Sequence, residues 1–181
     1  SSLSAVSGLS AGSYSVTVTD SKGCTAVSSA NVSNIAGGTA SATVISNALC
    51  NGSCDGSATV TVSGGSAPFT YNWSNGSAGI TAMGLCAGSY TVTVTDNAGC
   101  LIVTGVSVTE PALLTVSGTG GTTICNGSCD GTATASAGGG ISPYSYLWSA
   151  GAQTTATATG LCAVTYFVTA TDGNGCTATG S

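Results

Sequence analysis

The chain has 181 residues, and its only charged side chains are one lysine and six carboxylates, which gives a net charge of −5. Without a basic patch, a chain is poorly suited to bind nucleic acid or anionic membranes. It also lacks histidine and arginine, so the residues needed for acid–base, triad or phosphate chemistry are missing, and we expect no enzyme, no catalytic residue and no cofactor.

One motif occurs three times. Gly8–Cys24 reads GLSAGSYSVTVTDSKGC, Gly84–Cys100 reads GLCAGSYTVTVTDNAGC, and Gly160–Cys176 reads GLCAVTYFVTATDGNGC. The closing cysteines, at positions 24, 100 and 176, lie 76 residues apart both times. A fixed period of this kind indicates tandem copies of one structural unit.

The period divides the chain into three parts. We predict that residues 1–33 are the C-terminal part of a first repeat, that residues 34–110 are a complete second repeat, and that residues 111–181 are a third repeat lacking most of its last strand. Asn34–Gly38 reads as a glycine-containing link, and Glu110-Pro111 marks the next boundary. Because the chain begins and ends within a repeat, we expect it to be a piece of a longer protein.

Short runs in which valine or an aromatic residue alternates with threonine or serine are typical of half-buried strands. No apolar run approaches the roughly 18–20 residues of a membrane span. The predicted strands are Ala5–Ser7, Ser13–Thr19, Thr25–Val32, Ala42–Ser46, Ser57–Ser63, Pro68–Ser74, Ser77–Met83, the Tyr90–Val94 region of the repeated motif, Leu101–Thr109, Thr132–Ala137, Pro143–Ser149, Thr154–Thr159 and the motif strand that precedes Cys176.

About seven short strands per repeat, spaced by 8–12 residues, predict an all-β fold of tandem immunoglobulin-like β-sandwiches. A tryptophan ends the aromatic strand of both later repeats, where it would fill the gap between two sheets. A tyrosine lies near the start of the motif strand, where its hydroxyl would tie the corner to nearby backbone. The predicted core residues are Trp73, Trp148, Tyr14, Tyr90 and Tyr166.

The motifs also recur in a fixed order: CNGxCDGxAT, then GG…P(F/Y)xYxW, then GLCAGxYxVxVTDxxGC and a proline-containing linker. In this combination the chain resembles the SprB-type repeat of large secreted surface proteins of Bacteroidetes, including gliding-motility adhesins. The resemblance implies a cell-surface or filamentous role, export by the type IX system and no catalysis in the repeat. The chain departs from the motif at Ser10, which replaces the cysteine found at Cys86, and at Val164, which replaces Gly88.

Nine cysteines in a chain without histidine or a CxxC motif indicate disulfides in an oxidising compartment, not a zinc site. In an immunoglobulin-like sandwich the second and the penultimate strands start at the same end. Cys54 and Cys86 precede those two strands, so we expect them to be neighbours, and Cys129 and Cys162 likewise.

Two pairings remain open for the other cysteines. If the domains stack end to end, Cys50 can reach Cys176 of the following domain, which leaves Cys24, Cys100 and Cys125 to pair outside this stretch. The alternative joins Cys50 to Cys100 and Cys125 to Cys176 within domains, and leaves Cys24 unpaired.

Two weaker patterns have ordinary structural explanations. Asp20, Asp96 and Asp172 occupy the same position of the TDxxGC turn, where a single carboxylate is too little for calcium, and a turn-forming aspartate is the better reading. Rows of alternating threonines suggest ice or sugar binding, but they also describe the solvent face of any strand.

These observations predict a non-catalytic structural repeat of a long extracellular adhesin or filament on a bacterial cell surface. Its expected partners are neighbouring repeats of the same chain and like chains in a fibre, with no nucleic acid and no membrane span in this stretch. The alternatives are a glycan-binding adhesive module and, less strongly, an ice-binding module. The loops are nearly identical between copies and the aromatic residues lie on strands, which favours the structural role.

Overall fold

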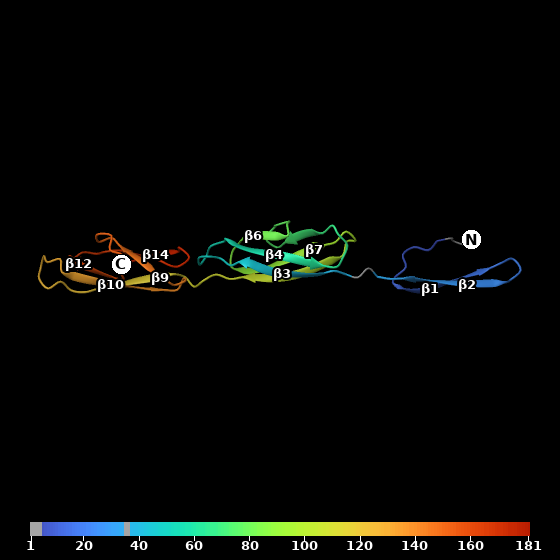
Figure 1. Ribbon diagram of the computed structural model, residues 1–181, viewed down its shortest axis with the longest axis horizontal. Coiled ribbons are helices and arrows are strands. Elements are labelled where there is room, and N and C mark those ends of the chain that lie inside the picture. The colour runs from blue at the N-terminus through green and yellow to red at the C-terminus, as the bar shows by residue number, and fades with distance from the viewer. Residues whose placement is uncertain (1–4, 35–36) are drawn as a thin grey trace.

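A computed structural model describes residues 5–34 and 37–181. Every regular element in these residues is a strand, and the fourteen strands form three units arranged in a row along an elongated molecule (Figure 1). The described residues contain no helix that is long and apolar enough to cross a membrane. The prediction of an all-β fold is therefore confirmed.

The first unit is a hairpin of β1 (Gly12–Thr19) and β2 (Thr25–Val32), which pair antiparallel along their whole length. The prediction of a strand at Ala5–Ser7 is wrong, because these residues have no regular structure. Their counterparts in the second unit, at Thr81–Leu85, form a strand by pairing with another strand of the same sheet, and the described residues of the hairpin unit include no such neighbour. Of the predicted link Asn34–Gly38, residues 35–36 lie outside the described residues.

The second unit consists of two three-stranded antiparallel sheets, with strand orders β3-β4-β6 and β5-β7-β8. This order is consistent with an immunoglobulin-like sandwich, although it has six strands in place of the expected seven. The strands are β3 (Thr39–Ser46), β4 (Gly56–Ser63), β5 (Thr70–Trp73), β6 (Thr81–Leu85), β7 (Gly88–Thr95) and β8 (Leu101–Val108).

The predicted strand at Ser77–Met83 starts four residues too early, because a turn takes its first residues. The backbone N–H of Gly76 donates to the carbonyl of Trp73, and the N–H of Trp73 donates to the carbonyl of Ser77. These bonds fold the chain back on itself before β6 begins, as an Asn-Gly pair favours.

The third unit repeats the same plan, with strand orders β12-β10-β9 and β11-β13-β14. Its β13 is half as long as β7, and the residues before it, 162–167, make turns and irregular backbone. The strands are β9 (Thr115–Gly120), β10 (Gly131–Gly138), β11 (Ser145–Trp148), β12 (Thr157–Leu161), β13 (Val168–Thr171) and β14 (Thr177–Gly180).

Each six-stranded unit has one small core between its two sheets. Eight buried side chains form the core of the second unit and five form that of the third. Trp73 and Trp148 are buried in these cores, and each indole N–H donates to a backbone carbonyl, of Gly79 at 2.9 Å and of Thr155 at 3.0 Å. Tyr90 and Tyr166 are half-buried against the cores, whereas Tyr14 is half-buried on the hairpin.

Candidate functional site

Two disulfides lie within the six-stranded units, Cys54–Cys86 and Cys129–Cys162. In each case one cysteine precedes the strand β4 or β10 and the other precedes the motif strand, and these are the neighbours that strand polarity led us to expect. The bridges therefore tie the two sheets of a unit together at one end.

A tyrosine closes the same corner in all three units. The hydroxyl of Tyr90 donates to the carbonyl of Cys86 at 3.1 Å, and the hydroxyl of Tyr14 donates to the carbonyl of Ser10 at 2.8 Å. In the third unit the hydroxyl of Tyr166 instead accepts from the backbone N–H of Cys162 at 3.2 Å. Because Ser10 cannot form a bridge, the corner does not depend on the disulfide.

The CNGSCDG motif forms a compact turn, residues 49–55, which we call the acceptor turn. The hydroxyl of Ser53 receives the N–H of Cys50 at 3.1 Å, and its one hydrogen is shared between the carbonyl of Cys50 at 2.9 Å and the carboxylate of Asp55. The carboxylate of Asp55 accepts the N–H of Leu49 at 3.0 Å and the hydroxyl of Ser53 at 2.8 Å. These two bonds, the one from Leu49 first, lower the pKa of Asp55 below its ordinary value.

The TDxxGC motif forms a second compact turn, which we call the docking turn; it comprises residues 20–24, 96–100 and 172–176 in the three units. In the second unit the carboxylate of Asp96 accepts the backbone N–H groups of Cys100 at 2.8 Å, Ala98 at 2.9 Å and Ser66 at 3.1 Å. These bonds, the one from Cys100 first, hold the pKa of Asp96 below its ordinary value of 3.8. The carboxylate therefore closes the turn as an ion, although it is buried.

Asp172 has the same role in the third unit. Its carboxylate accepts the N–H groups of Ile141, Asn174 and Cys176, each at 2.9 Å. The bond from Ile141 is the main cause of its lowered pKa. Both oxygens are thus engaged with backbone donors, which is the turn-forming arrangement and not one prepared for a cation.

The acceptor and docking turns of one unit lie at opposite ends. In the third unit the acceptor turn immediately precedes β10, while Ile141, which contacts the docking turn, follows the end of β10. Eight residues of strand separate the two ends by about 26 Å at roughly 3.3 Å per residue. Units stacked in the same direction therefore bring the docking turn of one unit against the acceptor turn of the next.

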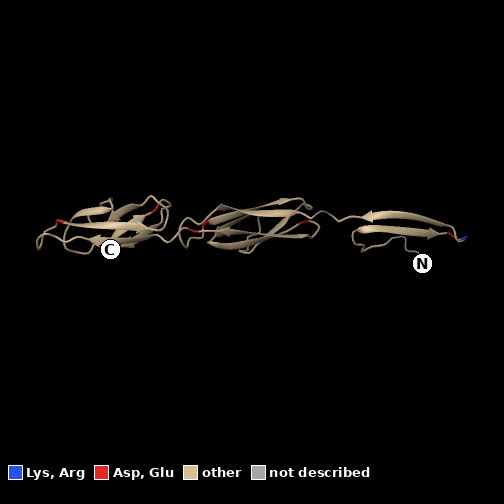
Figure 2. Ribbon diagram, turned by 90° about the horizontal axis from the view of Figure 1, so that it is seen from below, with Lys and Arg blue, Asp and Glu red and all other residues tan. Residues whose placement is uncertain are grey.

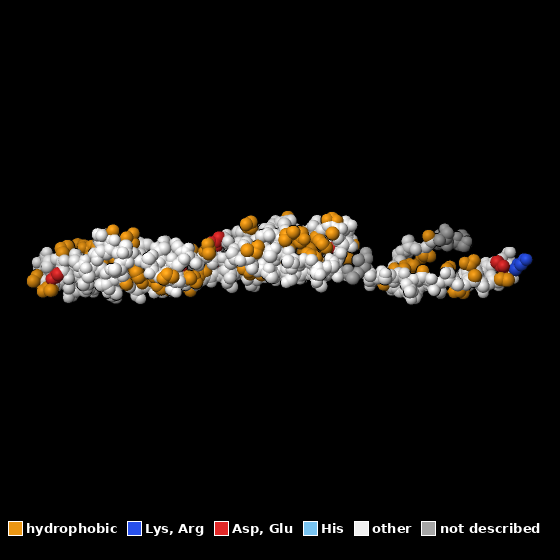
Figure 3. Space-filling view, viewed as in Figure 1, with side chains coloured by type: hydrophobic (Ala, Val, Ile, Leu, Met, Phe, Trp, Pro, Cys, Tyr) orange, Lys and Arg blue, Asp and Glu red, His pale blue; other side chains and the backbone are white. Residues whose placement is uncertain are grey.

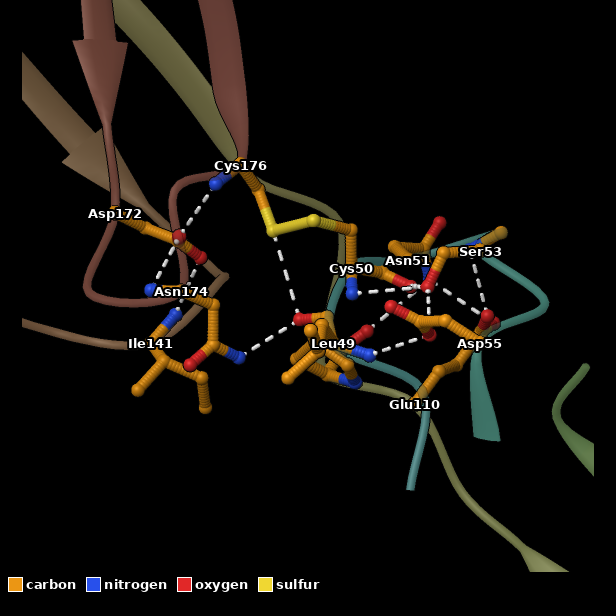
Figure 4. Close-up of a disulfide and its surroundings, with 12 residues drawn as sticks. Leu49, Cys50, Asn51, Ser53, Asp55, Glu110, Ile141, Asp172, Asn174 and Cys176 are labelled. Carbon is orange, nitrogen blue, oxygen red and sulfur yellow. Dashed lines mark hydrogen bonds between the residues drawn. A yellow bond between two sulfur atoms is a disulfide. The ribbon is translucent and has the colours of Figure 1, made fainter. Parts of the chain in front are cut away.

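The structure contains this contact between the second and third units, and a disulfide crosses it (Figure 4). Cys50 of the acceptor turn is bonded to Cys176 of the docking turn, with their Cα atoms 5.8 Å apart. The side-chain amide of Asn174 donates to the carbonyl of Leu49 at 2.7 Å, and Cys176 Sγ lies 3.5 Å from the same oxygen. Since a bonded sulfur carries no hydrogen, that last approach is a packing contact.

The linker between the two units is held by the same acceptor turn. The carboxylate of Glu110 accepts the backbone N–H of Gly52 at 2.6 Å and the side-chain amide of Asn51 at 3.0 Å. That amide also donates to the carbonyl of Pro111 at 3.1 Å. The linker is therefore fixed to the second unit immediately before the third unit begins.

Of the two open pairings, the structure has the one across the junction, and the bridges Cys50–Cys100 and Cys125–Cys176 are not formed. Cys24, Cys100 and Cys125 are exposed and unpaired among the described residues.

The sequence did not reveal the polar contacts that accompany the junction bridge. Glu110 could have been noticed, because it is the only acidic residue outside the repeat-equivalent aspartates. Asn174 offered no such sign, since its position in the motif is occupied by a different residue in each copy.

The third unit has a surface groove of about 690 Å³ beside β9, β10 and the turn before β13. Its lining is mostly glycine, threonine and alanine, and Gly131 forms part of it. In the second unit the corresponding Gly56 is packed against the side chain of Val108 from β8. In the second unit, the side chain of Val108 therefore occupies the space that corresponds to this groove. The residues that line the groove form no cluster of polar ligands.

The SprB repeat is the family whose model matches this chain, at residues 42–78 and 123–153. The first match begins within β3 and the second begins directly before the acceptor turn of the third unit. Each match covers an acceptor turn and the aromatic strand that follows it. No curated protein matches the chain. Two segments of the chain, one in each of its six-stranded units, are therefore similar to the SprB repeat.

Proposed function

We propose that this chain is a non-catalytic structural segment of a long extracellular adhesin or filament on a bacterial surface, in which cross-linked repeats form a stiff rod. SprB repeats occur in surface proteins, and three disulfides fit an oxidising environment outside the cytoplasm. The proposed role is to carry tension and to hold a terminal region away from the cell.

The observation that carries the proposal is the covalent junction between units. Domains joined only by a flexible linker reorient freely, because interfaces within a chain are commonly small. Here the Cys50–Cys176 bridge and the Asn174 contact connect the two units directly, and Glu110 fixes the linker to the second unit. A bridge between the units and a linker held in place together oppose bending and rotation about the linker.

The surface also suits a structural role. Few charged side chains appear on the face seen in Figure 3, and the hydrophobic ones are interspersed with uncharged polar surface. A nearly uncharged rod experiences little electrostatic repulsion from its neighbours. Lateral packing of like chains is therefore compatible with this surface.

The glycan-binding alternative predicts aromatic side chains on exposed loops. Both tryptophans are buried, and the tyrosines at the corners, Tyr90 and Tyr166, are half-buried. Phe167 is the one strongly exposed aromatic among the described residues, at 56%. A single exposed ring without neighbouring polar ligands favours the structural role over sugar recognition.

Immunogold electron microscopy of the source bacterium tests the proposal, with an antibody raised against this chain. We expect gold particles along thin structures outside the cell, at positions that proteinase treatment of intact cells removes. Labelling confined to the cell interior would contradict the proposal. A glycan array with the same chain provides the comparison, and specific binding there would favour the alternative.

A further inference from the structure

Asparagine followed directly by glycine is a chemically fragile sequence, and it occurs four times in this chain, at Asn51, Asn75, Asn126 and Asn174. Asparagine is among the thermolabile residues of proteins, because the backbone nitrogen of the next residue can attack its side-chain amide. A following glycine favours this attack, since it has no Cβ and adopts backbone conformations that other residues avoid. The surroundings of each pair therefore determine how long it survives.

The reaction is a cyclisation followed by hydrolysis. The backbone nitrogen of the glycine loses its proton and forms a bond to Cγ of the asparagine, while the bond from Cγ to Nδ2 breaks and the side-chain nitrogen leaves as ammonia with that proton. Water then opens the cyclic imide at one of its two carbonyls, which gives either aspartate or isoaspartate. Overall, one water is consumed, one ammonia is released, and nothing is oxidised or reduced.

Two of the four pairs occupy the same place in two acceptor turns. Residues 49–55 contain Asn51–Gly52, and residues 124–130, the acceptor turn of the third unit, contain Asn126–Gly127. The two glycines have φ values of 77° and 84°, and in each turn the N–H of the serine donates to the carbonyl of the first cysteine, at 3.0 Å and 3.1 Å. Both pairs are exposed. Backbone shape and exposure therefore do not distinguish them.

The linker between the second and third units distinguishes them (Figure 4). The N–H of Gly52, whose nitrogen would attack, donates to the carboxylate of Glu110 at 2.6 Å. The side-chain nitrogen of Asn51, which would leave, donates to the other oxygen of that carboxylate at 3.0 Å and to the carbonyl of Pro111 at 3.1 Å. In the pair Asn126–Gly127, neither the side-chain amide nor the glycine N–H has a hydrogen bond among the described residues.

The carboxylate opposes the steps that cyclisation requires. Loss of the Gly52 proton would place negative charge on a nitrogen that lies 2.6 Å from a carboxylate oxygen, and a like charge at short range disfavours this. The bonds of the amide nitrogen also hold the Asn51 side chain in one orientation, and departure of that nitrogen would break them. Figure 2 shows acidic side chains where the second and third units meet, so the opposing charge is a feature of the junction.

We propose that Asn51–Gly52 is a site of spontaneous conversion to aspartate or isoaspartate, and that Glu110 of the linker protects it. Conversion would remove the amide donor and place a second carboxylate beside that of Glu110, so an attractive contact would become a repulsive one. Isoaspartate would also add a methylene group to the main chain, within the turn that carries Cys50. Protection by Glu110 therefore prolongs the life of the junction. The inference does not depend on the proposed function.

The test incubates the purified 181-residue chain, with its bridges intact, in a mildly alkaline buffer. Peptide mapping by mass spectrometry follows the fraction of each asparagine that has been converted. We expect Asn126 to be converted several-fold faster than Asn51 in the original chain. E110A should raise the rate at Asn51 to that at Asn126 and leave the rate at Asn126 unchanged. E110Q, which keeps the size of the side chain and removes its charge, should also raise the rate at Asn51.

The other two pairs are internal controls. The N–H of Gly76 donates to the carbonyl of Trp73 at 2.9 Å without any contribution from Glu110, so conversion at Asn75 should be the same in the variants and in the original chain. The amide of Asn174 donates to Leu49 across the junction, so an unchanged rate there shows that the two units still meet. If E110A accelerates conversion at Asn75, the second unit has loosened, and E110Q then decides the result.

Equal rates at Asn51 and Asn126 in the original chain would overturn the inference, as would an unchanged rate at Asn51 in both variants of Glu110. Slower conversion of Asn51 in the variants would overturn it as well, because the carboxylate would then be acting as the base that removes the glycine proton. None of these outcomes concerns the bridge between Cys50 and Cys176. The inference can therefore fail while the proposed function stands.

Discussion

The tyrosine at the corner before the motif strand shows how one side chain serves the fold with and without a cross-link. The hydroxyl of Tyr14 bonds to Ser10 in the hairpin, and that of Tyr90 bonds to Cys86, whose sulfur is bridged. The ring packs against apolar neighbours in the second unit while the hydroxyl reaches the backbone. This division between an apolar ring and a polar tip is what a half-buried tyrosine supplies.

Y90F should lower the free energy of opening of the second unit by about 1 kcal/mol, the net value of one hydrogen bond. Hydrogen exchange of the β7 and β8 amides measures this free energy. Y71F is the control, because Tyr71 is also half-buried against the core, and no hydrogen bond of its hydroxyl is found among the described residues. Equal losses in the two variants would show that the corner bond contributes nothing.

Asp96 should make the stability of the second unit depend on acidity. Its pKa in the folded chain lies below the ordinary 3.8, so between the two values the unfolded chain binds more protons than the folded one. The stabilisation is present above the ordinary pKa and is lost as the pH falls through the folded pKa.

The measurement is hydrogen exchange or denaturant unfolding from about pH 6 to about pH 2, a range that begins above the ordinary pKa and extends below it. D96N should show a shallower loss of stability in acid than the original chain. Some loss should remain, because the pKa of Asp55 in the same unit is also lowered. An unchanged acid slope in D96N would be evidence against the role of this carboxylate.

Strands β4 and β10 occupy the same position in the repeat, but their buried side chains differ in size. Val60 of β4 is 2% exposed, and its counterpart in β10 is Ala135 at 5%. Alanine buries less apolar surface than valine, so the third unit gains less from this strand. Such replacements contribute to the smaller core of the third unit, and Ala137 in place of Val62 is another.

V60A should destabilise the second unit by about 2 kcal/mol, since it removes two buried methyl groups and leaves a cavity. V103A in β8 is the matched control, because Val103 is 64% exposed. Its effect should stay within about 0.5 kcal/mol. Chemical denaturation of both variants, followed by fluorescence of the buried tryptophans, makes the comparison, and similar losses would place Val60 outside the core.

At the scale of the whole molecule, the junction bridge determines which part of the chain feels a pulling force. A force applied to the two ends passes from Cys50 directly to Cys176 through the disulfide, and the span of 126 residue steps from one cysteine to the other is not stretched. Reduction of all bridges should therefore add about 430 Å of extension when the chain unfolds, at 3.3–3.6 Å per residue.

Single-molecule force measurements on C50S separate this bridge from the others. The inner bridges still hold 32 and 33 of the 126 residues, which leaves 61 to be stretched. The added extension in C50S should thus be about 210 Å. C100S should unfold with the length of the original chain, because Cys100 is unpaired. Identical lengths for C50S and C100S would mean that the junction bridge does not carry the force.

Much of the fold could be predicted because its causes are local. Alternating residues located most strands, and Thr25–Val32 was predicted with the bounds that β2 has. The incorrect strand predictions lie where hydrogen bonds to other segments determine the structure. Ala5–Ser7 has no strand to pair with among the described residues, and the turn before β6 makes that strand begin later than predicted. Strand formation at such positions depends on hydrogen bonds to residues that sequence pattern does not identify.

The period, the two kinds of turn and the end of the unit at which each cysteine lies could all be predicted from the sequence, because strand direction and turn chemistry follow from nearby residues. The partner of Cys50 could be identified only in the folded chain. That partner is 126 residues away, and the choice depends on how two units stack. Asn174 supports this stack through its contact with Leu49, which exists only once both units have folded.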